Sequence, residues 1–403
     1  MTTQDDAPTA LAELFDPAAR ADPYPRYRSW RENAPAHRAG DVLVLSRHED
    51  CTAVLRNPAF GHTEQDPPQR RQNPALVDEN GRPVRSFLGL NPPDHTRLRR
   101  LVSAAFTPRR VAHLAPRIEV LARQHVDDVL SGGPVDLIGT LAAPLPVVVI
   151  SELLGVPARD RDLFAGWSHA MARGLDPDFL LPPETLDQQA RARAEFVDYF
   201  RGLIADRRHH PGDDLLSALV GVRDQGDALT EQELLATCVL LLIAGHETTV
   251  NLIGNGTLAL LRNPAQLRQL RSDPDGAERA VEEMLRYDSP VQLTLRYALD
   301  DTAVAGTPVP AGTVVLALLG AANRDPEAHD DPDRFAITRE PTRHLAFGQG
   351  IHFCLGAPLA RLEGKIVFHE LARRQPTLHL AAEPEWKTNI VLRGMSRLPV
   401  EPA

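Results

Sequence analysis

The stretch that most constrains the fold of this 403-residue chain is TEQELLATCVLLLIAGHETTVNLIGNGTLALLRNP, which spans Thr230–Pro264. Thr230 and Glu233 have the spacing of a capping box, and Pro264 marks the far end. At about 1.5 Å per residue, a helix of this length extends roughly 50 Å. Its centre is apolar on nearly all sides, which predicts a helix that runs through the core.

The remaining patterns predict a mainly α protein with a smaller β portion. Helical spacing of apolar residues dominates from about residue 92 to about residue 290 and again over 355–374. A short opening helix is expected after Asp22. The β-rich portions are expected at about 36–47, at 290–320 and near the C-terminus. No repeat or linker divides the chain, so we expect a single domain over residues 1–403.

Composition excludes several classes of function. The net charge of −10 disfavours a protein that binds nucleic acid, because phosphate binding needs a basic face. The start of the chain has no pattern of a secretory leader, and the apolar run Cys238–Gly245 is too short to span a bilayer. Three widely spaced cysteines do not form a disulfide framework. We therefore expect a cytoplasmic protein with no membrane association.

One cysteine stands in a glycine-rich loop, FGQGIHFCLG, which spans Phe347–Gly356. A helix is expected from Leu355, so Cys354 lies at a helix N-terminus, where amide groups favour a thiolate. The residues alone leave three interpretations open, namely a thiolate ligand of haem iron, a catalytic nucleophile or a buried structural cysteine. Zinc is disfavoured because His352 is too close to Cys354 and the sequence has no CxxC partner.

This loop resembles the haem-binding signature of the cytochrome P450 family, Phe-Gly-x-Gly-x-His-x-Cys-x-Gly. Every fixed position matches: Phe347, Gly348, Gly350, His352, Cys354 and Gly356. The resemblance extends over essentially the whole chain and is greatest to soluble actinobacterial members that oxidise polyketides, macrolides, terpenoids and steroids. It implies haem b between the long central helix and the helix after the loop, with Cys354 as the axial thiolate.

The polar residues AGHETT in the centre of the long helix form the second motif. A buried acid beside a hydroxyl is costly unless it is paired or used. The zinc-protease pattern fails because Val250 stands where a second histidine is needed. By resemblance to the family, Glu247 and Thr248 are the acid–alcohol pair that delivers protons, and Ala244 and Gly245 leave room for O2. Thr249 is expected to bond to its own helix backbone.

Two further sets of residues take their roles from the resemblance. Glu283 and Arg286, with an arginine from the following meander expected to be Arg334, form a structural network that fixes the haem core. His95, Arg99, Arg296 and His352 are expected to bind the haem propionates, which need cationic donors. The His-x-x-x-Arg and Glu-x-x-Arg spacings occur elsewhere in the chain, so their sequence context carries the assignment.

The resemblance predicts a monooxygenase that inserts one atom of O2 into a bulky lipophilic molecule. About fifty residues follow Cys354 and contain no flavin or iron–sulfur domain, so electrons from NAD(P)H are expected through a separate ferredoxin reductase and ferredoxin. A monomer is expected. The candidate docking residues for the ferredoxin are Arg100, Arg109, Arg110, Arg361 and Lys365.

The substrate pocket is expected beneath the turn-rich loop Pro58–Leu90, with Gly174–Thr185 as a mobile lid. The residues expected to contact the substrate are mainly apolar: Leu88, Leu180, Leu181, Leu240, Leu293, Thr294 and Val391. We expect C–H hydroxylation or epoxidation of a polyketide or macrolide, and a steroid, secosteroid or terpenoid hydroxylase is the first alternative. Two further alternatives remain. A peroxide-driven haem enzyme would carry arginine and proline in place of Glu247 and Thr248, and a non-catalytic haem protein would need no such pair.

Overall fold

The computed structural model describes residues 16–62, 76–78, 80–176, 181–224, 226–340, 343–374 and 377–402. Helices make up most of it. Their bounds are α2 Tyr24–Asn33, α3 His48–Arg56, α4 Asp94–Ala105, α5 Pro108–His113, α6 Ala115–Leu130, α7 Pro144–Leu153, α8 Arg161–Ala172, α9 Pro183–His209, α10 Leu215–Gly221, α11 Glu231–Arg262, α12 Pro264–Ser272, α13 Ala277–Tyr287, α14 Leu319–Ala322 and α15 Ala357–Arg373. Short helical turns include η2 Phe87–Gly89, η3 Ile138–Ala142, η5 Arg173–Leu175 and η8 Gly350–His352.

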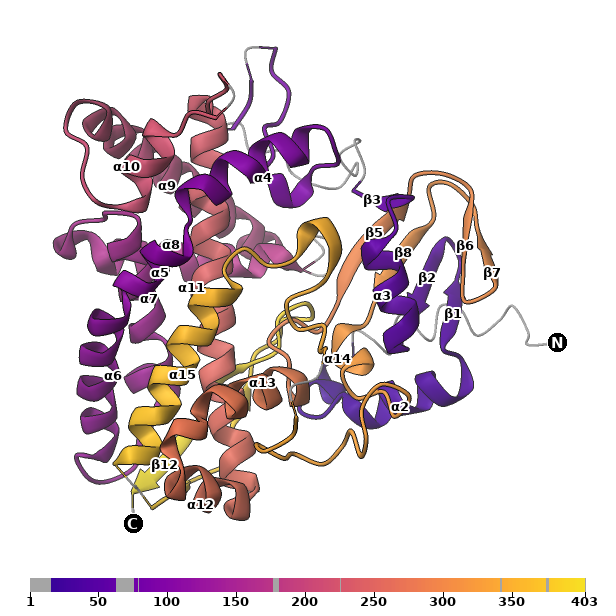
Figure 1. The fold of residues 1–403 in the computed structure, drawn as a ribbon, viewed down its shortest axis with the longest axis vertical. Coiled ribbons are helices and arrows are strands. Elements are labelled where there is room, and N and C mark those ends of the chain that lie inside the picture. Colours follow the sequence, from indigo (N-terminus) through magenta and orange to yellow (C-terminus); the bar gives the residue numbers. More distant parts are fainter. Residues whose placement is uncertain are drawn as a thin grey trace.

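The strands form several small sheets, of which the largest lies at one side of the helices (Figure 1). The largest sheet has the order β1-β2-β8-β5-β3, built from β1 Ala36–Ala39, β2 Val42–Leu45, β8 Val314–Ala317, β5 Thr294–Ala298 and β3 Phe60–Gly61. Its only parallel pair is β2 with β8. The other strands are β4 Val135–Asp136, β6 Thr302–Val304, β7 Thr307–Val309, β9 Leu378–Leu380, β10 Glu385–Trp386, β11 Met395–Arg397 and β12 Pro399–Pro402.

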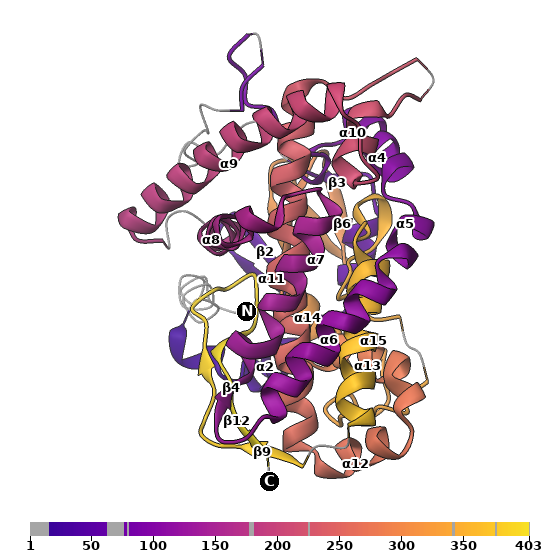
Figure 2. The same ribbon diagram turned by 90° about the vertical axis from the view of Figure 1, so that its left-hand side faces the viewer.

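Helix α11 is the predicted central helix, and it runs through the middle of the helical part (Figure 2). Thr230 caps it, and the capping box with Glu233 is complete, as the sequence predicts. The helix is long and apolar enough to cross a membrane by composition alone. However, 72% of its most apolar window is buried inside the protein, which is the behaviour of a core helix.

Helix α15 lies beside α11, and two glycines bring helices close together (Figure 1). A Cβ on Gly364 of α15 would lie 3.2 Å from Leu252 of α11. A Cβ on Gly256 of α11 would lie 2.7 Å from the ring of Phe368 on α15 and 2.6 Å from the sulfur of Met284 on α13. Because these contacts join the C-terminal half of α11 to α15, the loop before α15 lies nearer the middle of α11.

The predicted distribution of helices and strands is confirmed, with two local differences. The loop expected over Pro58–Pro74 begins with strand β3, whose residues Phe60 and Gly61 pair with β5, and residues 63–75 lie outside the described residues. The helix after the cysteine loop begins at Ala357 rather than at Leu355, because Gly356 occupies the N-cap position.

Candidate functional site

A stripe of accessible surface interrupts helix α11, most of whose residues are buried. Ala244 is exposed, and Leu240, Leu241, Gly245 and Thr248 are half-buried, although the other residues in this part of α11 are buried. Leu240, Ala244 and Thr248 are spaced four residues apart and so share one face of the helix. An exposed alanine in the middle of a core helix indicates an open space beside it.

The cysteine loop supplies a second accessible apolar surface. Ile351 is 52% exposed and Phe353 is 41% exposed, although both are large apolar residues. The loop has positive φ at Gly348 (65°) and Gly350 (71°), a conformation that favours glycine. A Cβ on Gly350 would lie 2.2 Å from the carbonyl oxygen of Leu55, so this glycine is also required for close approach to α3.

Cys354 is held by its own loop in a setting that suits a thiolate ligand. Its amide donates to the Phe347 carbonyl at 2.9 Å. Burial raises the pKa of the Cys354 thiol above its ordinary value, although the backbone amides of Gly356 and Ala357 and the charge of Arg99 act in the opposite direction.

Two histidines of the expected propionate set lie together. The ring centroids of His95, on α4, and His352, in the loop, are 4.3 Å apart, and the ring of His62 lies 4.7 Å from that of His352. Neither ring nitrogen of His352 has a hydrogen-bond partner among the described residues. The same holds for His95, although a ring nitrogen lies near the backbone of Ile351. Burial and then the charge of Arg296 lower the pKa of His352 to about 2.

Two arginines complete this cluster. Arg99 donates to the carbonyl of Phe353 and lies over the Phe87 ring. Arg296, on β5, is 6% exposed and donates only to the Leu295 carbonyl and the Thr294 hydroxyl. Burial lowers the pKa of Arg296 to about 10. Within the described part of the chain, neither guanidinium forms an ion pair with a carboxylate.

A haem group fits these residues. Two buried or half-buried guanidiniums and two imidazoles converge, and the described residues supply no carboxylate to pair with them. The carboxylates of two propionates would supply the missing negative charge. The open face of α11 and the loop around Cys354 provide apolar surface on either side. The thiol would supply the sulfur ligand for the iron.

The acid of the expected proton-delivery pair is ion-paired in the structure. Glu247 is 5% exposed and accepts a hydrogen bond from Nζ of Lys387. Burial alone would raise the pKa of Glu247, but the charge and hydrogen bond of Lys387 bring it below its ordinary value. The hydroxyl of Thr248 donates to the Ala244 carbonyl at 2.6 Å, and Thr249 bonds to the Gly245 carbonyl as expected.

Gly245 has a second role beside the one predicted for it. Ala244 is exposed and Gly245 is half-buried, but a Cβ on Gly245 would lie 3.2 Å from Cδ1 of Ile150. Because Ile150 belongs to α7, the missing side chain of Gly245 allows α7 to pack on α11. Room for O2 beside Ala244 and Gly245 stays a prediction.

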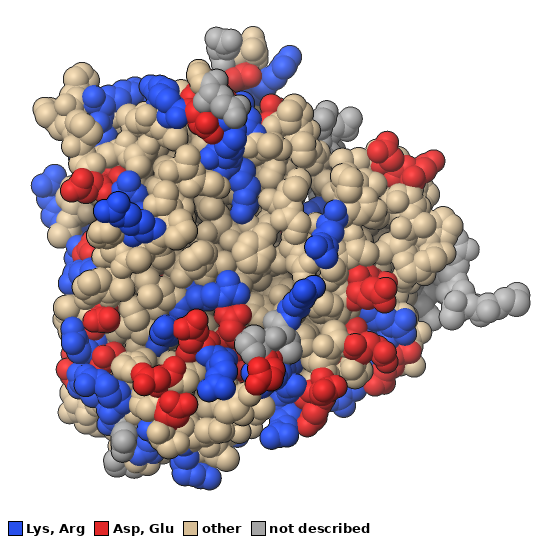
Figure 3. Space-filling model, in the orientation of Figure 1, with Lys and Arg blue, Asp and Glu red and all other residues tan. Residues whose placement is uncertain are grey.

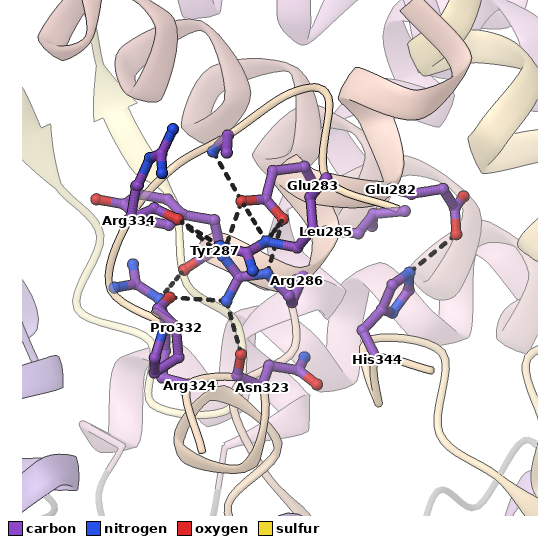
Figure 4. A network of polar contacts seen from close by, with 12 residues as sticks. Glu282, Glu283, Leu285, Arg286, Tyr287, Asn323, Arg324, Pro332, Arg334 and His344 are labelled. Atoms are coloured by element: carbon purple, nitrogen blue, oxygen red, sulfur yellow. Dashed lines mark hydrogen bonds and ion pairs between the residues drawn. The ribbon is translucent and has the colours of Figure 1, made fainter. Parts of the chain in front are cut away.

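Glu283 and Arg286 form the predicted buried network (Figure 4). Arg286 is 1% exposed and donates to Glu283 through Nε at 2.7 Å and Nη2 at 2.8 Å. It also donates to the carbonyl oxygens of Asn323, Pro332 and Arg334. All of these partners are fixed backbone or buried side chain, so the network fastens α13 to the segment that precedes the cysteine loop.

The third member of this network differs from the prediction. Arg334 contributes its carbonyl oxygen, not its guanidinium. The side chain that pairs with Glu283 belongs to Arg339, whose Nε lies 3.2 Å from Oε2 and 3.3 Å from Oε1. The chain turns at Asp331, which has a φ of 44°, and this turn presents the backbone of Arg334 to Arg286.

The expected substrate contacts divide into three groups. Leu88, Leu240, Thr294 and Val391 have accessible surface and remain candidates. Leu293 and Leu181 are 6% and 7% exposed. Leu293 packs in a cluster with Leu316 and Leu318, so it belongs to the core and not to an open wall. Leu180 and part of the expected lid lie outside the described residues.

Several of the expected docking residues are already paired. Arg100 pairs with Asp224, Arg361 with Glu282 and Lys365 with Glu278. On the face of the molecule that Figure 3 shows, Lys and Arg side chains are interleaved with Asp and Glu in the lower part. Arg110 donates to backbone carbonyls, and Arg109 is exposed. A uniformly basic patch is therefore not present around α15.

Sequence reasoning missed Lys387, although the chain offered a signal. Lysine occurs only at positions 365 and 387, whereas arginine supplies nearly all other basic residues. Lys387 is 14% exposed and reaches the centre of α11 from the C-terminal segment. The rarity of lysine in this chain singles out Lys387, but nothing in the sequence indicates that its turn lies beside Glu247.

Comparisons with known proteins agree with this geometry. The family model described as cytochrome P450 matches residues 168–375. The chain is 45% identical to cytochrome P450 107B1 of Saccharopolyspora erythraea, with 99% of each chain covered. It is 39% identical to the 6-deoxyerythronolide B hydroxylase of the same organism, with 97% of this chain and 99% of the relative covered.

A solved structure shows the same fold. Ligand-free CYP164A2 of Mycobacterium smegmatis superposes with a TM-score of 0.88 at 46% identity, and 99% of this chain and 100% of that chain are covered. The family implies haem bound through a cysteine thiolate. Identity at this level over nearly the full length, together with the cysteine loop and the central helix, establishes that the chain belongs to the cytochrome P450 family and is a monooxygenase.

Proposed function

We propose that this monooxygenase hydroxylates, or epoxidises, a bulky lipophilic molecule of the polyketide or macrolide class. The observation that carries the proposal is the accessible apolar stripe on α11, which faces an interior space although the helix is otherwise buried. A pocket with apolar walls and few polar groups selects a lipophilic ligand. The name of the 6-deoxyerythronolide B hydroxylase supports this class of substrate.

The cofactor in this proposal is haem b. Haem held through a thiolate supplies oxygen activation, because the thiolate pushes electron density toward the iron and favours O–O cleavage. Cys354 is the proposed ligand. His95, Arg99, Arg296 and His352 are the proposed partners of the propionates, since these four side chains lie together without a carboxylate among the described residues.

Glu247 and Thr248 are the proposed proton-delivery residues. Thr248 stands on the accessible face with Ala244, and its hydroxyl can exchange its intrahelical bond for one to a bound molecule. Glu247 lies one residue away and is kept ionised by Lys387. This pair disfavours the peroxide-driven alternative, which carries arginine and proline at these positions.

Electrons are proposed to come from NAD(P)H through a ferredoxin reductase and a ferredoxin. Arg109 is the exposed candidate for docking, because Arg100, Arg361 and Lys365 already have acidic partners. An acidic ferredoxin should reduce the protein at a rate that falls with salt. An unchanged reduction rate after Arg109→Glu would remove Arg109 from this role.

The test of function is a Soret titration of the purified ferric protein. We expect macrolides and polyketide lactones to shift the spectrum toward high spin more strongly than steroids, terpenoids or fatty acids, because the ligand displaces water from the pocket. A thiolate-type CO spectrum is the control for an intact site. A shift with steroids or terpenoids only would overturn the substrate class, and a CO spectrum without thiolate character would overturn the assignment of Cys354.

A carrier-linked substrate is examined separately with the same compounds attached to an acyl carrier protein. A spectral shift with the tethered compound but not with the free acid would support the proposed class of substrate. It would also mean that the enzyme recognises the carrier protein. Turnover with NAD(P)H, reductase and ferredoxin then identifies whether the product is an alcohol or an epoxide.

A further inference from the structure

Lys387 connects the C-terminal segment to the proton-delivery acid. Its Nζ donates to Oε1 of Glu247 and, at 3.1 Å, to Oδ1 of Asn251. Glu247 and Asn251 lie four residues apart on α11, so one ammonium group spans consecutive turns of the same helix face. The side chains of Lys387 and Glu247 are 14% and 7% exposed, which makes this a largely desolvated ion pair.

The backbone around Lys387 is pressed against α11. The Lys387 amide donates to the Gly394 carbonyl at 3.0 Å. A Cβ on Gly394 would lie only 1.9 Å from Oδ1 of Asn251, so no larger residue can occupy this position without moving the segment. Asn255, one turn further along α11, donates to the carbonyl of Arg393 at 3.1 Å. The position of Lys387 relative to the helix is therefore closely defined.

Lys387 also lines a small cavity of about 40 Å³, together with Trp386 and Arg393. A site needs roughly 10–15 Å³ of such volume to hold one water molecule. The volume is therefore enough for a few water molecules, and Lys387 contacts both this cavity and the carboxylate of Glu247.

The turn that follows Lys387 is tied to the end of α8. Asp176 is 4% exposed, and its Oδ1 accepts from the amides of Ile390 at 2.9 Å and Val391 at 3.0 Å. Arg173 donates to the hydroxyl of Thr388. Residues 174–176 are the described start of the expected lid segment Gly174–Thr185, and Arg173 directly precedes it. The same five-residue turn therefore contacts the lid segment at one end and Glu247 at the other.

We propose that Lys387 is the positioning residue for Glu247, and that the turn Lys387–Val391 transmits the position of residues 173–176 to this carboxylate. A buried carboxylate needs its partner, and the attraction falls with distance, so a displaced turn would release Glu247 toward the pocket. This inference rests on the proposed role of Glu247 in proton delivery. The contacts that carry it do not depend on the identity of the substrate.

The experiment uses the purified haem-loaded protein, with Lys387→Met, Glu247→Gln and the double variant. The infrared C–O stretch of the ferrous CO complex reports the polar groups beside the bound CO and requires no substrate. We expect Lys387→Met to shift this band and the double variant to match Glu247→Gln alone, since both residues act through one carboxylate. Lys387→Arg should restore most of the wild-type band.

A matched control is Arg397→Met, which removes an exposed cation from strand β11 and its exposed pair with Glu385. This variant should leave the band unchanged. An absent shift in Lys387→Met, or shifts that add in the double variant, would overturn the positioning role. If Lys387→Met fails to fold because Glu247 is left unpaired, recovery of folding by the added Glu247→Gln change supports the pairing, and failure to recover contradicts it.

The link to the lid segment is tested with Asp176→Ala and Thr388→Val. Both should shift the C–O band in the direction of Lys387→Met. An unchanged band in both turn variants would overturn the link. A wild-type CO complex without thiolate character would instead refute the proposed function, so the two failures are distinguishable.

Discussion

Two buried arginines of this molecule have opposite surroundings. Arg286 is 1% exposed and has two bonds to Glu283 and three to backbone carbonyls. Arg296 is 6% exposed, yet it bonds only to Thr294 and Leu295 beside it, and the described residues provide no carboxylate for it. A folded chain tolerates a buried charge when it is paired, or when a ligand is to supply the partner.

The difference separates a structural network from a binding site without reference to any motif. The Arg286 guanidinium is paired with the carboxylate of Glu283, and each of its three nitrogens has an acceptor. Around Arg296 the neighbours are Arg99, His95 and His352, which add positive charge or unpaired ring nitrogens. Such a cluster is costly in the haem-free protein, and a doubly anionic ligand would relieve the cost.

The largest effect on stability is expected at the network of Glu283, Arg286 and Arg339. Arg286→Ala leaves Glu283 buried with only the partly exposed Arg339 as a cationic partner, and it also frees three carbonyl oxygens. We expect the free energy of unfolding to fall by about 3–5 kcal/mol, as for other broken buried ion pairs. Urea unfolding of the haem-free protein measures this loss, and the yield of folded haem protein should fall with it.

Three control variants sharpen this expectation. Arg201→Ala removes two solvent-accessible ion pairs, to Asp198 and to Glu231, and it should cost less than about 1 kcal/mol. Arg334→Ala should leave the free energy of unfolding nearly unchanged, because only the carbonyl of Arg334 takes part in the network. Arg339→Ala should lower the free energy of unfolding by about 1–2 kcal/mol. A loss in Arg334→Ala as large as that in Arg339→Ala would contradict the assignment of Arg339 as the third member.

No loss of stability is expected at the cluster of His95, Arg99, Arg296 and His352. Arg296→Leu removes a buried charge that has no counter-ion, so the haem-free protein should unfold at the same urea concentration or a higher one. Haem affinity should nevertheless fall by about 2–3 kcal/mol, because a desolvated partner of a propionate is lost. The rate of haem transfer to an excess of apomyoglobin measures the second quantity.

Arg38→Leu is the control for this pair of measurements. Arg38 is an exposed cation on β1 of the same sheet and donates to the Pro308 carbonyl. It should change neither haem transfer nor unfolding appreciably. If Arg296→Leu destabilises the haem-free protein as much as Arg286→Ala does, the cluster is part of the structural framework and the comparison between the two arginines fails.

The sequence predicted the parts of the molecule in which local pattern and fold agree. Helix α11 with its Thr230 cap, helix α13 and the pair Glu283–Arg286 follow from spacing and capping signals. Arg334 and Arg339 could not be distinguished, because both lie in a meander whose backbone turns decide which group faces inward. Local patterns carry no information of that kind.

The candidate site shows the same limit. Thr248 and Ala244 lie on the accessible face by helical geometry alone, so sequence spacing was sufficient to place them. Lys387 is 140 residues from Glu247 in the chain, and only the tertiary fold brings its turn to α11. Leu293 was expected on the pocket wall, but its side chain packs in the core with Leu316 and Leu318.

The smallest of the predicted effects concerns pH. An unfolded histidine has a pKa of about 6.5, whereas burial and the nearby guanidinium of Arg296 lower the pKa of His352 to about 2 in the haem-free protein. Between these values the unfolded chain binds a proton that the folded protein does not, so the free energy of unfolding should fall as the pH falls. The slope from this residue approaches about 1 kcal/mol per pH unit.

Urea unfolding of the haem-free protein at pH 7, 6 and 5 measures this slope, and His352→Asn should flatten it. His113→Asn, which changes an exposed histidine on α5, should leave the slope unchanged. His95, whose pKa burial and Arg99 also lower, should retain part of the dependence in the variant. In the haem-loaded protein the propionates would favour the charged imidazole, so the slope should weaken. A slope that is equal with and without haem would mean that no anion enters the cluster, and the contrast between Arg286 and Arg296 would then reflect packing alone.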